Sequence, residues 1–121
     1  MGVSLYDKEG SQRRIDAMYV LTTAEGVQAL LVNYKQFSLM PYERGDYGAV
    51  DTLIVLEQAM EEANLTHKQR QALQLVYIEG YTQKEVAKLQ GVSQQSVAKH
   101  LATATQKIAD VYKYWEKRGA Y

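Results

Sequence analysis

The sequence has no cysteine, one proline, one phenylalanine and one tryptophan in 121 residues. Without cysteine the chain forms no disulfide scaffold, no thiolate zinc finger and no cysteine nucleophile. No apolar run approaches the roughly 20 residues that a membrane-spanning helix needs, so we expect no membrane partner. The first ten residues contain Asp7 and Glu9 and lack an apolar core, so we expect no signal peptide.

The net charge is zero, but the two halves of the chain differ in sign. Residues 1–64 carry five basic and ten acidic side chains, a net charge of −5, and residues 65–121 carry nine basic and four acidic ones, a net charge of +5. The asymmetry indicates a basic half that meets an anion and an acidic half that does not. If only the charges are considered, chance clustering of solvated side chains is an equally good explanation of the difference between the two halves.

The single proline, Pro41, lies in the stretch that is richest in helix breakers, residues 38–48, which we interpret as a linker. Residues 1–48 are then an acidic helical segment that contacts a partner or a second copy of the chain. Within them, apolar spacings of three and four over residues 12–37, interrupted at Thr22, Thr23 and Gly26, predict two helices.

Residues 49–121 form the second domain in this interpretation, with four helices. The first covers residues 49–63, and we assign its inward side to Val50, Leu53, Ile54, Leu56 and Met60. The other three are marked by capping residues and glycine stops, namely Thr66 with Gln69 before Gly80, Thr82 with Glu85 before Gly91, and Ser93 before a helix from Gln94 to about Trp115. No alternating pattern predicts a strand, so the fold class is all-α.

Residues 82–101 predict two short helices joined by a tight turn. Ala87 is small where the helices approach each other, and Gly91 suits the left-handed backbone of the turn. Their shared core is assigned to Val86, Leu89, Val97 and Leu101, with Val92 filling the angle between them. This is the helix-turn-helix arrangement, whose second helix lies in the DNA major groove. A plain helical hairpin would not explain why residues 94–107 are polar and basic and lack an acidic side chain.

Residues from about Val50 to Ile108 resemble region 4 of bacterial sigma factors, the module that reads the −35 promoter element. The matching residues are Leu65-Thr66, 69–73, 79–87, Gly91-Val92-Ser93 and Val97-Ala98-Lys99. The resemblance implies a four-helix unit that binds DNA through its last helix. It also implies docking on RNA polymerase through an apolar groove.

The sequence departs from this family in two ways that affect the expected DNA binding and the expected type of protein. Family members often place several arginines after the lysine of the recognition helix, whereas no lysine or arginine follows Lys99 before Lys107. Fewer cations mean fewer phosphate contacts. Residues 1–48 also lack the segment that melts the −10 element. The resemblance therefore implies a transcriptional regulator of the phage, prophage or mobile-element type, cytoplasmic and nucleoid-associated in a bacterial cell.

Candidate site residues follow from the helix-turn-helix geometry. The base contacts are Gln94, Gln95, Ser96, Lys99 and His100, on the exposed start of the recognition helix. The phosphate contacts are Lys68, Arg70, Thr82, Gln83, Lys84, Ser93 and Lys107. Glutamine pairs bidentately with adenine and lysine favours guanine. The first amides of the helix that follows Thr82 suit a phosphate.

Ten tyrosines leave two interpretations open. Near the C-terminus, Tyr112 and Trp115 either pack on the core or join Tyr114 and Tyr121 in a protein-contact surface. A dimer face is assigned to Tyr6, Tyr19, Leu30, Leu31 and Tyr34. Since helix-turn-helix proteins frequently dimerise, we expect a homodimer.

The sequence predicts no enzyme, cofactor or metal site, because it has no glycine-rich phosphate loop, no metal-ligand spacing and no recognisable catalytic set. His67 and His100 are too few for a metal site. We predict sequence-specific binding of double-stranded DNA, with RNA polymerase or another transcription factor as the protein partner. The alternatives are a DNA-packaging adaptor similar to small terminase subunits, and an interaction module that binds the transcription machinery without DNA.

Overall fold

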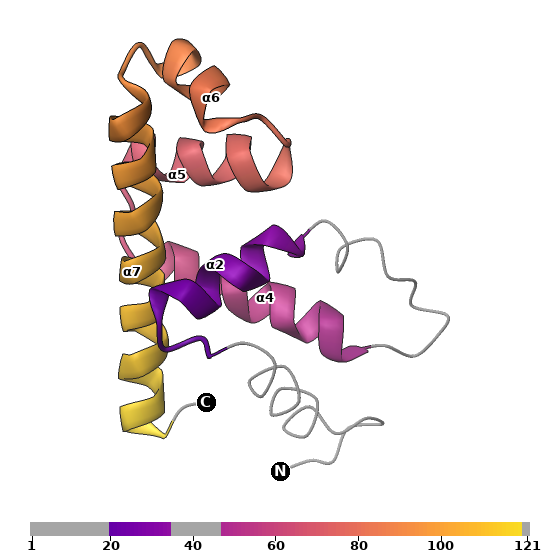
Figure 1. Ribbon diagram of the computed structural model, residues 1–121. Helices are drawn as coiled ribbons and strands as arrows, with labels where there is room; N and C mark the ends of the chain where they lie inside the picture. The colour runs from indigo at the N-terminus through magenta and orange to yellow at the C-terminus, as the bar shows by residue number, and fades with distance from the viewer. Residues whose placement is uncertain (1–19, 35–46, 120–121) are drawn as a thin grey trace.

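The computed structural model describes residues 20–34 and 47–119 (Figure 1). Its elements are the α-helices α2 (Ala24–Val32), α4 (Tyr47–Glu62), α5 (His67–Leu73), α6 (Gln83–Gln90) and α7 (Gln94–Arg118), and one π-helical turn, η2 (Gln74–Ile78). All elements of the described residues are helical, so the all-α class is confirmed. Among these residues no helix combines the length and apolar character needed to cross a membrane.

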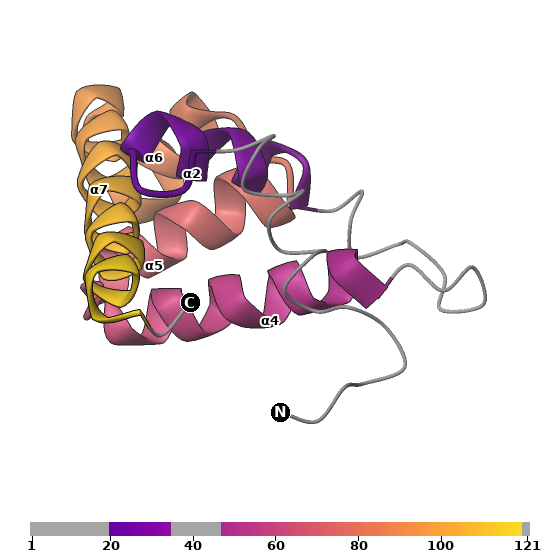
Figure 2. The same cartoon turned by 90° about the horizontal axis from the view of Figure 1, so that it is seen from below.

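The longest helix, α7, is the axis of the fold. Figures 1 and 2 show α2, α4 and α5 on one side of it, with α6 at the end where α7 begins. Apolar side chains at spacings of three and four form its buried side, namely Val97, Leu101, Ala104, Ile108, Ala109 and Tyr112. This periodicity explains why α7 packs against four other helices along its length. Its C-terminal cap is Gly119, so it ends later than the predicted Trp115.

Local capping residues set the helix boundaries, as the sequence predicts. Both capping boxes form, with Gln69 N donating to Thr66 Oγ1 at 3.2 Å and Glu85 N donating to Thr82 Oγ1 at 3.1 Å. Gly91 has the left-handed backbone expected for the turn, with φ of 68°. The helix that begins after Thr66 widens into the π-helical turn η2, where Glu79 N donates to Gln74 O at 3.0 Å. Sequence patterns gave no sign of this turn.

Helix α2 is part of the same core as the helix-turn-helix. Its side chains Val27, Leu30 and Leu31 are buried, and the helix packs mainly on α7. The hydroxyl of Tyr34 donates to Glu57 Oε2 of α4 at 3.1 Å. Leu30 and Leu31 are therefore not available for the predicted dimer face. The other residues of that prediction, Tyr6 and Tyr19, lie outside the described part, as do Tyr121 and most of the linker.

The N-terminus of α2 corrects the role assigned to Gly26. Thr22 and Thr23 do precede the helix, and Thr23 Oγ1 is its N-cap, accepting from Gly26 N at 3.1 Å. Gly26 itself lies inside the first turn rather than interrupting the helix. An added Cβ there would lie 1.9 Å from the carbonyl oxygen of Val20. The glycine is thus required by close packing against the preceding turn.

Two apolar side chains assigned to the core are in fact exposed. Leu89 is 60% exposed, because it lies two residues after buried Ala87, on the other side of α6. Ile54 is 49% exposed for the same reason, since it stands two residues from both Thr52 and Leu56, which are buried. Leu56, Leu53 and Met60 do contact the core. Val50 lies outside the residues whose side chains are described.

Candidate nucleic-acid interface

The helix-turn-helix is formed by α6, the turn at residues 91–93, and the start of α7. Val92 N donates to Ala87 O at 3.0 Å and closes the turn. Ser93 Oγ accepts from Ser96 N at 3.1 Å and caps α7. Val86, Val97 and Leu101 are buried between the helices, while Val92 is partly buried against them. The predicted arrangement is confirmed, with Leu89 as the exception noted above.

The exposed side of α7 at its N-terminal end carries five residues that we call the recognition face. They are Gln94, Gln95, Ala98, Lys99 and Ala102, all exposed and separated by spacings of one, three and four. This spacing places them on one side of a helix, opposite buried Val97 and Leu101. No acidic residue occurs between Val86 and Ala109, so nothing in this part of the chain repels an anion.

The other two base-contact candidates, Ser96 and His100, lie beside the recognition face rather than on it. Both are only partly exposed. The hydroxyl of Ser96 is 3.0 Å from that of Ser93, within the cap of the helix. His100 Nδ1 is buried, with no hydrogen-bond partner in the described part of the chain. The structure thus brings all five candidates to one end of α7, with three of them pointing outward.

Sequence reasoning missed Ala98 and Ala102, because alanine has no hydrogen-bonding side chain. The helical spacing from Gln94 and Gln95 to Ala98, Lys99 and Ala102 was the available signal. Ala98, between the glutamines and the lysine, and Ala102, one turn after Ala98, leave this side of the α7 backbone uncovered by long side chains.

Most phosphate candidates lie around the recognition face, on α5, α6 and the turn. Lys84 is exposed at the start of α6, next to Thr82 and Gln83. Lys68 Nζ donates to Gln90 O at 3.3 Å, and Gln90 Nε2 donates back to Lys68 O at 3.1 Å. These bonds hold the start of α5 against the end of α6. Lys68 therefore lies close to the turn, and Arg70 is exposed two residues further along α5.

Lys107 is set apart from the other candidates. It lies 13 residues after Gln94, roughly 20 Å along the helix. Its Nζ donates to Gln69 Oε1 at 3.0 Å, the same oxygen that accepts from Thr66 N in the capping box of α5. This bond gives Lys107 a structural role in tying α7 to α5.

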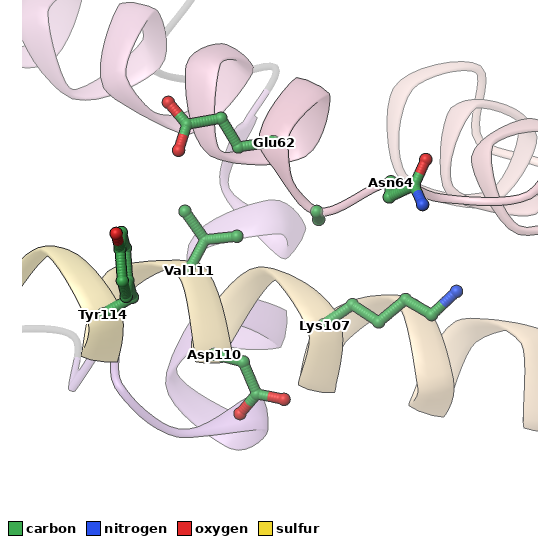
Figure 3. A pocket seen from close by; sticks show the side chains of 7 residues that line it. Glu62, Asn64, Lys107, Asp110, Val111 and Tyr114 are labelled. Atoms are coloured by element: carbon green, nitrogen blue, oxygen red, sulfur yellow. The ribbon is translucent and has the colours of Figure 1, made fainter.

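A hollow between the end of α4 and the C-terminal half of α7 is shown in Figure 3. Its lining consists of Glu62, Ala63, Asn64, Lys107, Asp110, Val111 and Tyr114. The described residues contain no group of acidic and histidine side chains suited to a metal ion. Trp115 Nε1 donates to Glu62 Oε1 at 3.1 Å. We assign no chemistry to this hollow.

The aromatic side chains near the C-terminus pack on the core. Tyr112 is fully buried, and its ring meets that of Trp115 edge-on at 5.4 Å. Tyr114 is exposed, with the Arg118 guanidinium 5.2 Å from its ring centre. The packing interpretation is therefore confirmed for Tyr112 and Trp115.

Glu85 makes the start of α6 sensitive to pH. The backbone N–H of Thr82, which donates to its carboxylate at 2.9 Å, and then the Thr82 hydroxyl hold the pKa of Glu85 below its ordinary value of 4.5. Because the folded pKa is lower than the unfolded one, this stabilisation is complete above pH 4.5 and is lost as the pH falls through the folded value.

We predict that Glu85→Gln, which keeps the capping box but not the charge, is less stable than the native chain at pH 6. The difference in stability should be smaller at pH 3, because that pH lies below the ordinary pKa of 4.5. Urea unfolding of both proteins at the two pH values measures this. A difference in stability that does not change with pH would contradict the role given to the carboxylate.

Comparison with known proteins agrees with this geometry. The family model for Sigma-70, region 4 matches residues 56–108. Comparison with curated proteins and with solved structures gave no match. The matched span runs from the second half of α4 into α7 and contains every candidate base and phosphate residue, whereas α2 lies outside it. This match supports a DNA-binding helix-turn-helix that acts in transcription regulation, and residues 56–108 of the chain are similar to sigma region 4.

Proposed function

We propose that the protein binds double-stranded DNA sequence-specifically, with the start of α7 in the major groove, and thereby regulates transcription. The observation that carries this proposal is the recognition face, which is exposed and has no acidic neighbour in the chain between Val86 and Ala109. Figure 1 shows α2 and α4 packed further along α7, away from this end. A duplex therefore approaches the recognition face without displacing another element of the described part of the chain.

Base contacts come from Gln94, Gln95 and Lys99 in this proposal, with Ser96 and His100 at the edge of the groove. Glutamine suits adenine and lysine suits guanine. The phosphates on either side are contacted by Lys84 at the start of α6 and by Lys68 and Arg70 of α5. These few cations are consistent with modest affinity for a single module.

The modest affinity of a single module bears on the oligomeric state, while the proposed protein partner and cellular setting rest on the similarity to sigma region 4. We propose a homodimer, because a second recognition helix would multiply the contacts to paired half-sites. RNA polymerase or another transcription factor is the proposed protein partner. The proposed setting is the cytoplasm and nucleoid of a bacterial cell, with phage or mobile-element genes as targets. We propose a non-enzymatic role.

A second candidate, an interaction module that does not touch DNA, is favoured by one observation. Leu89 and Tyr81 are large apolar side chains exposed on or beside α6. Such side chains commonly contact other proteins. This candidate predicts no binding to duplex DNA, even at low salt.

The Lys84→Ala variant tests the proposed function. We expect it to weaken binding to all duplexes alike and to flatten the slope of log affinity against log salt by about one, because one phosphate contact is lost. Fluorescence anisotropy with a labelled duplex over a salt series measures the slope. Lys113→Ala is the matched control, since Lys113 is exposed near the far end of the same α7. Equal effects of the two variants, or no binding at all, would contradict the proposal.

A further inference from the structure

At the position of Ala98 the recognition face carries only a methyl group, whereas base contacts are commonly made by longer side chains. Ala98 is exposed one turn after Gln94, and Ala102 is exposed one turn after Ala98. Gln95 and Lys99 lie along one side of the stripe formed by these three residues. Because Ala98 stands between the glutamines and the lysine, it lies at the centre of the face that enters the groove.

We propose that Ala98 reads the 5-methyl group of a thymine, an inference that rests on the proposed DNA-binding function. In the major groove only thymine presents a methyl group, and apolar side chains such as alanine contact it. Gln94 and Gln95 lie on the adjoining turn and are suited to adenine, whose paired thymine presents its methyl in the same groove. The start of α7 thereby selects A·T pairs with two chemically different contacts.

The small size of Ala98 is needed for this contact. A long side chain at the centre of the face would hold the helix away from the base edges. Ala98 instead allows its Cβ to come within van der Waals distance of a methyl group. The same argument applies less to Ala102, which lies one turn further from the N-terminal end of the helix, where base contacts are made in helix-turn-helix proteins.

Replacement of thymine by deoxyuridine tests the inference, because it removes one methyl group and leaves base pairing intact. Duplexes enriched by the full-length protein from a random pool are resynthesised with one deoxyuridine at each thymine in turn. We expect about fourfold weaker binding at one position, the effect of removing one buried methyl-sized group. Substitutions at the remaining thymines should change binding little.

Ala98→Gly removes the methyl group on the protein side and completes a double-mutant cycle. We expect this variant to bind the thymine duplex about fourfold more weakly and to show no further loss on the deoxyuridine duplex. Ala102→Gly is the matched control, because it causes the same loss of helix propensity at an exposed position of the same helix. Its effect should add to that of deoxyuridine.

The outcomes separate the inference from the function on which it rests. An enriched sequence that binds equally well with deoxyuridine at every thymine would overturn the role of Ala98 alone. Additive losses for Ala98→Gly and deoxyuridine would do the same. Failure to enrich any sequence would overturn the proposed sequence-specific binding, and this inference with it.

Discussion

Replacing Leu30 by alanine is expected to lower the free energy of unfolding of the helix-turn-helix by about 2–5 kcal/mol, the usual cost of truncating a buried leucine. Leu30 is fully buried, and it belongs to α2, outside the span that matches sigma region 4. Because α2 packs on α7, the loss should affect the whole domain. Urea unfolding followed by circular dichroism measures it, and we expect one transition shifted to lower urea.

Val32→Ala is the matched control for this variant. Val32 lies in the same helix but is 64% exposed. Its truncation should change stability by less than about 0.5 kcal/mol. If Leu30→Ala left the main transition in place and only reduced the helical signal before it, α2 would be a separate element and the single-core account would be wrong.

Gln95→Ala is expected to cost about 1–3 kcal/mol of discrimination at one base pair while leaving binding to random duplexes nearly unchanged. Gln95 is exposed on the recognition face and makes no hydrogen bond within the described residues that would fix it elsewhere. Its loss should therefore remove a base contact without disturbing α7. Competition between the enriched duplex and a random duplex, at fixed salt, measures the discrimination.

Gln106→Ala serves as the control for Gln95→Ala. Gln106 is exposed on α7 and donates to Asp110 Oδ1 at 3.0 Å, roughly 16 Å beyond Gln95 along the helix. We expect it to leave discrimination unchanged. Equal losses for the two glutamines would show that base reading is not confined to the start of α7.

Features governed by a few neighbouring residues were predictable from the sequence. The capping boxes at Thr66 and Thr82, the left-handed turn at Gly91 and the cap at Ser93 depend on contacts within about four residues of the chain. These local signals were enough to identify the helix-turn-helix and to predict that the base-contact candidates lie together at the start of α7.

Features governed by packing between distant segments were not predictable in the same way. Leu89 and Ile54 were assigned inward because they are apolar, but the neighbours that each helix meets decide which side is buried. The packing of α2 on α7 joins residues far apart in the sequence. In the candidate site, Ser96 and His100 were expected on the exposed part of α7 but are partly buried, and Ala98 carried no polar signal.

The most direct test of the central claim, that the start of α7 reads DNA sequence, is selection of random-sequence duplexes by the purified full-length protein across a salt series. The account predicts an enriched motif and a log–log salt slope of about −4 to −6, as expected when one or two modules neutralise that number of phosphates. A palindromic motif would show in addition that the protein binds DNA as a dimer. No retention of duplex at the lowest salt would contradict the account and favour the interaction module that never contacts DNA.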